Sequence, residues 1–295
     1  MIEPPVSCVN GDALRGLCDQ IFWSNDSPRP DSGFRHGEVV FCKIDEAWRF
    51  LGAARRQRSR VVLVTGEGDQ PVDQLLWNHK PPQVVRWFGT NMFVEAPGAE
   101  AIPLGLGNAQ GKKTLSWESI CSASASSPQR TGLLYANFSA HSNGAVRGPL
   151  LEWLGLPAQS WVTRESHDGG KTNYLERLLS HHFVLCPPGN GEDTHRLWES
   201  LYCGAIPVVR RSPAIAAFRD LPMLIVDDLR SITPETLEGY LVQRPASRID
   251  QLRLSYWSER IAVARRLAAD TPRVTLAGWM SAWLRELQVV VKVRR

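Results

Sequence analysis

Arg196 and Glu199 are the side chains best suited to chemistry in this sequence. They stand three positions apart in a stretch with helical features, so they share one face of a helix. A guanidinium matches two phosphate oxygens at once, and a carboxylate one turn further on can accept hydrogen bonds from both vicinal hydroxyls of a ribose. The pair fits the two ends of a nucleoside diphosphate, and the alternative is a surface ion pair worth about 0.5 kcal/mol.

The loop before this helix suits an anion. Gly189 and Gly191 let backbone amides come close to a ligand, and the chain then enters a helix N-terminus, whose free amides and dipole attract negative charge. We therefore expect a diphosphate at this loop and helix start. The residues concerned are Gly189, Asn190, Gly191, Thr194 and His195.

The same residues belong to one predicted βαβ unit, Ser180 to Arg210. An apolar strand ends at Leu185, Asp193 or Thr194 can cap the helix that follows, and Gly204 suits the left-handed position after that helix. A second apolar strand comes next.

Two series of short apolar runs alternate with amphipathic stretches, which is typical of α/β domains with parallel strands. The strands expected in the first series are 38–42, 61–65, 84–88, 93–95 and 101–104, with a helix through Trp48 and Leu51. The second series has expected strands at 133–137, 161–163, 182–185, 206–209 and 223–226, with helices at 146–154 and 173–179. The tail, 233–287, is expected to be mainly helical.

A length of 295 residues favours two domains. Ser122 to Gln129 consists almost entirely of Ser, Ala and Pro and separates the two series, so we predict the interdomain linker there. The expected domains are an N-terminal one over 1–128 and a C-terminal one over 129–295.

Composition and charge exclude several classes of protein. Hydrophobic residues make up 43% and charged residues 22%, which is typical of a folded globular chain rather than a disordered or fibrous one. The net charge of +4 is modest and no aromatic residues interleave the basic runs, so we expect no nucleic-acid partner. The basic runs would favour only weak peripheral association with an anionic membrane. The six cysteines form no C-x-x-C pair, which argues against a zinc site.

The sequence also suggests where the protein resides. No apolar run approaches the roughly 20 residues that span a bilayer, and the start Met1–Pro5 lacks the basic and apolar segments of a signal peptide. A cytoplasmic location is therefore expected.

The segment Ser180 to Arg210 resembles the exostosin-type glycosyltransferases, in particular their small bacterial relatives. The family pattern runs from a strand ending in Leu-Cys-Pro through a glycine loop to Arg-Leu-Trp/Phe-Glu-x-Leu and then Cys/Gly-Gly-x-Ile-Pro-Val. This sequence carries the motifs at 185–187, 196–201 and 203–208. Weaker similarity extends to 86–91, 101–108 and 134–139, with Arg147 following.

The resemblance implies a GT-B architecture, in which two Rossmann-like domains with parallel sheets face each other across a cleft. It implies that the C-terminal domain holds the donor, with Arg147 and Arg196 at the phosphates and Glu199 at the ribose. It also implies that no metal or other cofactor is needed, and the sequence contains no Asp-x-Asp triplet. Fucosyltransferases share the shape of the central motif, so GDP-fucose is an alternative donor.

A transferase that inverts the anomeric centre needs a general base on the acceptor side. Glu67 and Asp69 are candidates because they follow the strand 61–65, and loops at the carboxyl ends of parallel strands line the ligand crevice. The same segment also suits an ordinary polar turn. Asn91 is a candidate for acceptor binding. Lesser candidates for the base are Asp26, His36 and His79.

The sequence thus predicts a metal-independent, inverting glycosyltransferase. It would move a sugar from a nucleoside diphosphate sugar to a hydroxyl of a glycan, a lipid-linked saccharide or another acceptor. The alternative is a nucleotide-sugar or glycan binding module that has the same fold and no base.

Overall fold

The computed structural model describes residues 8–23, 33–108, 115–126, 128–165, 170–243 and 248–280. The chain forms two compact units. The N-sheet unit comprises Leu14–Ile102 and Trp257–Arg295, and the C-sheet unit comprises Met1–Ala13 and Pro103–Tyr256. Each contains one five-stranded parallel sheet, which confirms the predicted α/β class with two Rossmann-like domains.

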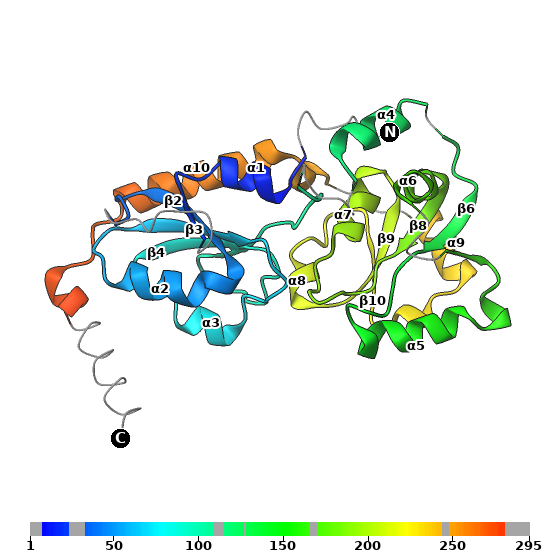
Figure 1. Ribbon diagram of the computed structural model, residues 1–295, viewed down its shortest axis with the longest axis horizontal. Coiled ribbons are helices and arrows are strands. Elements are labelled where there is room, and N and C mark those ends of the chain that lie inside the picture. Colours follow the sequence, from blue (N-terminus) through cyan, green and yellow to red (C-terminus); the bar gives the residue numbers. More distant parts are fainter. Residues whose placement is uncertain are drawn as a thin grey trace, which may run out of the picture. The chain divides into compact units, whose positions relative to one another are not determined.

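The strands of the N-sheet unit lie in sequence order. They are β1 (Gln20–Phe22), β2 (Glu38–Lys43), β3 (Val61–Gly66), β4 (Val84–Gly89) and β5 (Ala99–Ala101). Because each strand lies one place further in the same direction, right-handed crossovers put the connecting helices on a single face. That face carries α2 (Ala47–Arg55) and α3 (Gln74–Asn78), and α10 (Leu254–Asp270) covers the other (Figure 1).

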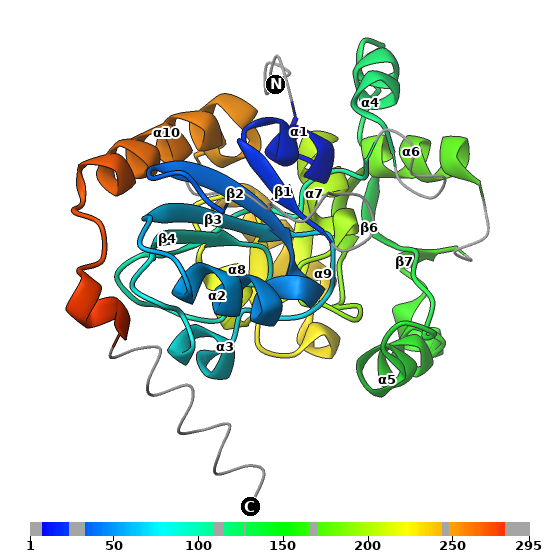
Figure 2. The same cartoon turned by 60° about the vertical axis from the view of Figure 1, so that its left-hand side comes forward.

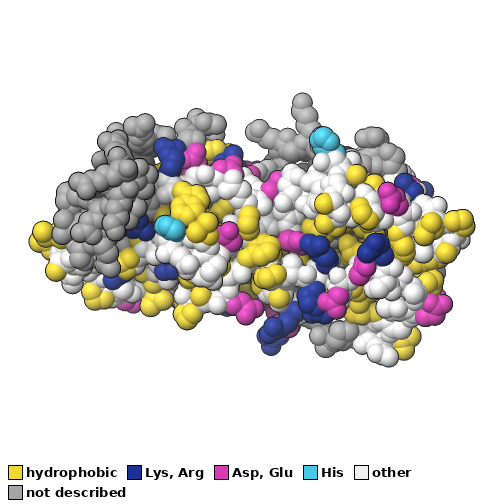
Figure 3. All heavy atoms as spheres, turned by 90° about the horizontal axis from the view of Figure 1, so that it is seen from below, with side chains coloured by type: hydrophobic (Ala, Val, Ile, Leu, Met, Phe, Trp, Pro, Cys, Tyr) yellow, Lys and Arg dark blue, Asp and Glu magenta, His cyan; other side chains and the backbone are white. Residues whose placement is uncertain are grey.

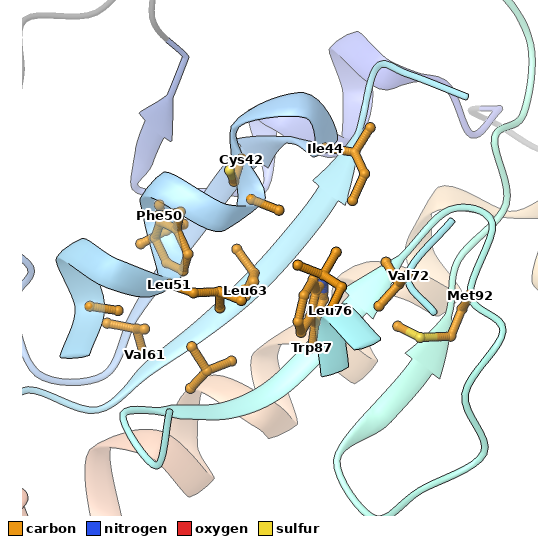
Figure 4. Packing of buried hydrophobic residues seen from close by; sticks show 14 of the residues in the cluster. Cys42, Ile44, Phe50, Leu51, Val61, Leu63, Val72, Leu76, Trp87 and Met92 are labelled. Atoms are coloured by element: carbon orange, nitrogen blue, oxygen red, sulfur yellow. The ribbon is translucent and has the colours of Figure 1, made fainter. Parts of the chain in front are cut away.

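The core of the N-sheet unit lies between the sheet and the helices α2 and α3 (Figure 4). Phe50 and Leu51 of α2 meet Leu63 of β3, while Trp87 of β4 lies beside Leu76 of α3. All of these side chains are buried. Each contributes about 1.5–3 kcal/mol through removal from water, so the carboxyl ends of β3 and β4 sit on a rigid support.

The strand order of the C-sheet unit is β10-β9-β8-β6-β7. Its strands are β6 (Gly132–Ala136), β7 (Val162–Arg164), β8 (His181–Leu185), β9 (Ile206–Arg210) and β10 (Leu224–Val226). The chain goes from β6 to its neighbour β7, returns past β6 to β8, and then continues outward on the opposite side. This reversal makes a topological switch point between β6 and β8, where ligands of such sheets bind.

Helices cover both faces of the second sheet. Figure 1 shows α5 (Gly144–Leu154) and α9 (Pro234–Val242) on one face, with α6 (Lys171–Ser180) and α7 (His195–Tyr202) on the other. The remaining helices are α1 (Gly11–Gly16), α4 (Trp117–Ser124), α8 (Pro213–Ala216) and the 3-10 turns Ile44–Glu46, Pro157–Gln159, Leu229–Ser231 and Asp250–Leu252.

The predicted linker at 122–129 is wrong in its first part, because α4 runs through Ser124. The Ser116 hydroxyl caps this helix by accepting a hydrogen bond from the Ser119 amide at 3.2 Å. Ile120 is buried, and α4 packs beside α6 (Figures 1 and 2). Alanine is the best helix former, so a Ser/Ala-rich composition does not by itself specify a linker.

The division into units also differs from the predicted domains 1–128 and 129–295. The chain changes unit at Ile102/Pro103 and returns to the N-sheet unit at Trp257. Arg265 of α10 is ion-paired with Asp19 at 2.6 Å, and the Arg58 Nε donates to the Val274 carbonyl at 2.9 Å. Helical periodicity reveals the apolar face of such a tail but not which sheet that face covers.

Two strands at the edges of the first sheet were not predicted correctly. The strand expected at 93–95 is absent, and the strand expected at 101–104 is displaced toward the N-terminus, as β5 at Ala99–Ala101. The three-residue strand β1 was not predicted, because none of its residues is fully buried and the segment lacks a continuous apolar run.

Within the described residues, no helix is long and apolar enough to cross a membrane. Trp48 of α2 and Leu75 of α3 are exposed, at 46% and 62%. Figure 3 shows apolar side chains scattered among polar ones on the side of the molecule seen from below. The Trp48 ring contacts the His79 ring at 4.7 Å between centroids. His79 thus has a packing role at this surface.

Candidate functional site

The predicted donor residues gather at the switch point of the C-sheet unit. The segment after β6 leads into α5, which carries Arg147, and the segment after β8 leads into α7, which carries Arg196 and Glu199. Since β6 and β8 are adjacent and parallel, both segments leave the same edge of the sheet. The sequence motif therefore lies where an open α/β sheet binds its ligands.

Arg147 connects the two segments. Its guanidinium is buried, at 6% exposure, and donates four hydrogen bonds at 2.6–3.2 Å. The acceptors are the carbonyl oxygens of Ser139, Pro187 and Pro188 and the Ser142 hydroxyl. A guanidinium has five N–H donors, so one on Nη2 remains. Arg147 thus braces both loops and also contributes positive charge to the site.

Arg147 and Arg196 share one electrostatic environment. Burial, and after it the positive charge of Arg196, lower the pKa of Arg147 to about 10. Two guanidinium groups held this close repel each other unless an anion lies between them. The arrangement favours binding of a negatively charged group.

Arg196 is the less satisfied of the two cations. Its Nε is buried and has no hydrogen-bond partner among the residues that the structure describes. In the part of the chain that the structure describes, its guanidinium forms no ion pair with Glu199, although the two lie one turn apart on α7. The alternative of a surface ion pair therefore does not describe this pair.

Glu199 is a buried carboxylate, at 4% exposure. Its Oε1 accepts a hydrogen bond from the Leu115 amide at 3.0 Å, and its Oε2 accepts one from the Tyr174 hydroxyl at 2.8 Å. A carboxylate has about four acceptor positions, so the described part of the chain leaves two of them for a ligand. This number matches the two hydroxyls of a ribose.

The glycine loop is folded close to Arg147. The Gly189 amide donates to the Gly191 carbonyl at 2.9 Å, and the Asn143 side chain donates to the Gly189 carbonyl at 2.9 Å. A Cβ at position 189 would lie 3.2 Å from the Arg147 Nη2, so glycine permits this approach. Asn190, at the tip, is exposed.

The start of α7 differs in detail from the prediction. Thr194 occupies the N-cap position, but its side chain makes no capping hydrogen bond. His195 Nδ1 donates to the Gly105 carbonyl at 2.8 Å, which directs this side chain toward the preceding connection rather than along the helix. The predicted loop residues are thus brought together, while His195 has a structural contact of its own.

Asp193 has a role that the sequence did not reveal. Its Oδ2 accepts from the Leu104 amide at 2.8 Å, and its Oδ1 accepts from the Trp198 indole. Burial raises the pKa of this carboxyl to about 7, and the hydrogen bonds that it accepts oppose that rise. Asp193 and His195 together hold residues 104–105 against the start of α7.

The predicted acceptor-side residues lie at the carboxyl ends of β3 and β4 in the N-sheet unit. Glu67 directly follows β3 and Asn91 comes two residues after β4, both in left-handed backbone conformations, with φ of 59° and 48°. Such conformations are uncommon for residues other than glycine and often occur at functional sites. Glu67 is ion-paired with Arg15 at 2.7 Å, Asp69 is exposed, and Asn91 is buried.

The other candidates for a base are less well placed. His36 precedes β2, and its Nδ1 accepts from the Arg60 amide at 3.1 Å while its Nε2 donates to the Ala269 carbonyl at 3.1 Å. Both ring nitrogens are therefore engaged at the amino end of the strand. Asp26 lies outside the described residues.

Tyr174 and Leu115 are site residues that sequence reasoning missed. Both contact Glu199, although they come from α6 and from the residue before the cap of α4. No motif marks them, because their contacts arise from the packing of α4, α6 and α7. No group of three or more potential metal-binding side chains occurs among the residues that the structure describes.

No protein-family model and no curated protein matches the sequence. Solved structures similar to the chain include AviGT4, a glycosyltransferase involved in avilamycin A biosynthesis, at 14% identity and a TM-score of 0.41 over 80% of this chain and 86% of that one. Another is an α,α-trehalose 6-phosphate synthase from Burkholderia multivorans, at 10% identity and a TM-score of 0.38 over 91% and 74%. At these identities and scores, neither reaction nor substrate carries over to this chain.

Proposed function

We propose that the chain is a glycosyltransferase that binds a nucleoside diphosphate sugar at the switch point of its C-sheet unit and transfers the sugar to a hydroxyl acceptor. The observation that carries the proposal is the buried Arg196 Nε, which has no hydrogen-bond partner within the described residues and lies near a second guanidinium. A buried unsatisfied donor costs about 1–3 kcal/mol, and a bound phosphate would remove that cost.

The donor set suits a diphosphate. Arg196 offers its guanidinium, Arg147 offers positive charge and one N–H, and the loop from Gly189 to Gly191 brings backbone close to the start of α7. Helix N-terminal amides and guanidinium groups are the usual protein partners of phosphate oxygens. Glu199 then accepts hydrogen bonds from the ribose through its two remaining acceptor positions.

In the proposed reaction, the acceptor oxygen forms a bond to the anomeric carbon while the bond to the diphosphate oxygen breaks. Negative charge develops on the leaving diphosphate, where Arg196 and the start of α7 stabilise it without a metal ion. Removal of one such donor typically lowers kcat about 100-fold to 1,000-fold. Glu67 or Asp69 takes the proton of the acceptor hydroxyl. Attack of the acceptor oxygen from the side opposite the leaving diphosphate inverts the anomeric centre.

The exostosin-type motif supports this assignment, because its Arg and Glu coincide with the unsatisfied guanidinium and the buried carboxylate. The donor is a nucleoside diphosphate sugar, with GDP-fucose as one alternative, and the acceptor is a hydroxyl of a glycan, a lipid-linked saccharide or another molecule. Asn91, buried at the end of β4, is proposed to bind the acceptor.

The test is a thermal-shift screen with UDP, GDP, dTDP, ADP and CMP, since a ligand that binds only the folded protein raises its melting temperature. One nucleoside diphosphate should stabilise the wild type with EDTA present and fail to stabilise the variants Arg196→Ala and Glu199→Ala. Arg211→Ala is the matched control, because this arginine is exposed and paired with Asp227. Stabilisation that survives both site variants, or that EDTA abolishes, would contradict the proposal.

A non-catalytic nucleotide-sugar binding module is the second candidate. It is favoured by the ion pair between Glu67 and Arg15, which already neutralises one candidate base. The two functions differ in turnover of the sugar nucleotide. The enzyme predicts release of nucleoside diphosphate that is lost in Glu67→Gln or in Asp69→Asn, whereas the binding module predicts no release in any variant.

A further inference from the structure

Glu199 is held by neutral hydrogen-bond donors from two separate elements. The Tyr174 hydroxyl comes from α6 and the Leu115 amide from the residue that precedes the cap of α4. No ion pair to this carboxylate is formed within the described ranges of the chain. A buried carboxylate of this kind keeps its acceptor strength, because no cation competes for its remaining positions.

Tyr174 donates its hydroxyl proton to Glu199 in a fixed geometry. Burial, and next to it the negative charge of Glu199, raise the pKa of this tyrosine well above its usual value, so the hydroxyl stays protonated. The buried residues Leu175, Leu178 and Leu179 anchor α6 beneath it. The Tyr174 hydroxyl is therefore held in position and donates its hydrogen bond to Oε2 of Glu199.

A glutamate carboxylate rotates easily about its terminal torsion, which is broad and roughly two-fold. A hydrogen bond to each oxygen fixes the plane of the group. Leu115 and Tyr174 provide one such bond each, at 3.0 Å and 2.8 Å. Of the two, only the bond from Tyr174 depends on a side chain and can be removed by substitution.

We infer that Tyr174 is a positioning residue that orients the Glu199 carboxylate toward the ribose hydroxyls of the donor nucleotide, and so determines the preference for ribonucleotides over deoxyribonucleotides. The inference rests on the proposed function. Without the Tyr174 hydroxyl, the carboxylate would lose its fixed plane and with it the simultaneous contact to both hydroxyls. Contacts to the diphosphate, which lie on Arg196 and the glycine loop, would be unaffected.

The experiment is isothermal titration with UDP, GDP and ADP and with their 2′-deoxy forms. The wild type should bind one ribonucleotide about tenfold or more tightly than its deoxy form, since a hydrogen bond to a charged group has about this effect. Tyr174→Phe should weaken ribonucleotide binding about tenfold and change deoxynucleotide binding less than about twofold. In a Glu199→Gln background the same substitution should have little further effect, because both changes act on one contact.

Tyr135→Phe is the matched control. This tyrosine is also buried and also donates to a carboxylate, but its hydroxyl binds Glu165 at 3.1 Å rather than Glu199. The control should keep the ribose preference of the wild type. Thermal unfolding of each variant shows whether it is folded.

The outcomes separate the inference from the proposed function. A wild type that binds no nucleoside diphosphate overturns both. Two results overturn the inference alone. In one, the wild type prefers ribonucleotides and the Tyr174→Phe variant retains this preference. In the other, Tyr174→Phe weakens the binding of ribonucleotides and deoxyribonucleotides equally. A preference for the deoxy form in the wild type also overturns it.

Discussion

Replacement of Arg196 by methionine is expected to make the ligand-free protein more stable and to weaken its binding of nucleoside diphosphates. The buried Nε of Arg196 has no partner, and its guanidinium repels that of Arg147. An unsatisfied buried donor costs about 1–3 kcal/mol, and methionine keeps the apolar stem that packs on α7. The free energy of unfolding should therefore rise by about 1 kcal/mol, which corresponds to about 2–4 °C in Tm for a domain of 150–250 residues.

The assay is thermal and urea unfolding of both proteins without ligand, followed by titration with the nucleoside diphosphate that stabilises the wild type. Affinity should fall by about tenfold to 100-fold, because hydrogen bonds to charged groups contribute about 1.5–3 kcal/mol each. Arg210→Met is the matched control, since that arginine is paired with Glu192 at 2.5 Å and should give no gain in stability. An Arg196→Met variant less stable than the wild type, or one with unchanged affinity, would refute the reasoning.

Three further predictions concern the same unit. Arg147→Lys should lower the free energy of unfolding by about 2–4 kcal/mol in urea titrations, because an ammonium cannot reproduce four bonds made by a planar guanidinium to two loops. Burial raises the pKa of the Asp193 carboxyl from 3.8 to about 7, so the folded protein binds the carboxyl proton more tightly than the unfolded protein does. The stability that this group contributes is complete below about pH 4 and is lost as the pH rises to about 7. The free energy of unfolding of the wild type, minus that of Asp193→Asn, should accordingly fall between about pH 4 and about pH 7, and a constant difference over this range would be contrary to this expectation. Gly105→Ala should destabilise the protein severely in thermal unfolding, because φ of Gly105 is +71° and a Cβ there would lie 2.0 Å from the Val9 carbonyl oxygen. Gly239→Ala is the control. It should stabilise the protein by about 0.5–1 kcal/mol, because Gly239 has a helical backbone and a Cβ there would meet nothing within 4 Å.

The donor segment was largely predictable, because its signals are local. The predicted strand, helix and strand correspond to β8, α7 and β9, and Gly204 ends the helix in the predicted left-handed conformation, with φ of +72°. Residue spacing placed Arg196 and Glu199 on one helix. It could not show that they form no ion pair.

The contacts that complete the site depend on packing between distant segments. Tyr174 reaches Glu199 across 25 positions and Leu115 across 84, and no spacing rule predicts such contacts. Arg147 illustrates the same limit, since its motif implied phosphate binding while the structure shows that most of its donors brace the loops after β6 and β8. For α10, the sequence also indicates which face of the helix is apolar, but it does not indicate which of the two sheets this face covers.

A crystal structure of the complex with the stabilising nucleoside diphosphate is the most direct test of the central claim. The account predicts a phosphate oxygen at about 2.9 Å from the Arg196 Nε and both ribose hydroxyls on the Glu199 carboxylate. A nucleotide bound elsewhere, or one bound here with Arg196 still without a partner, would contradict it.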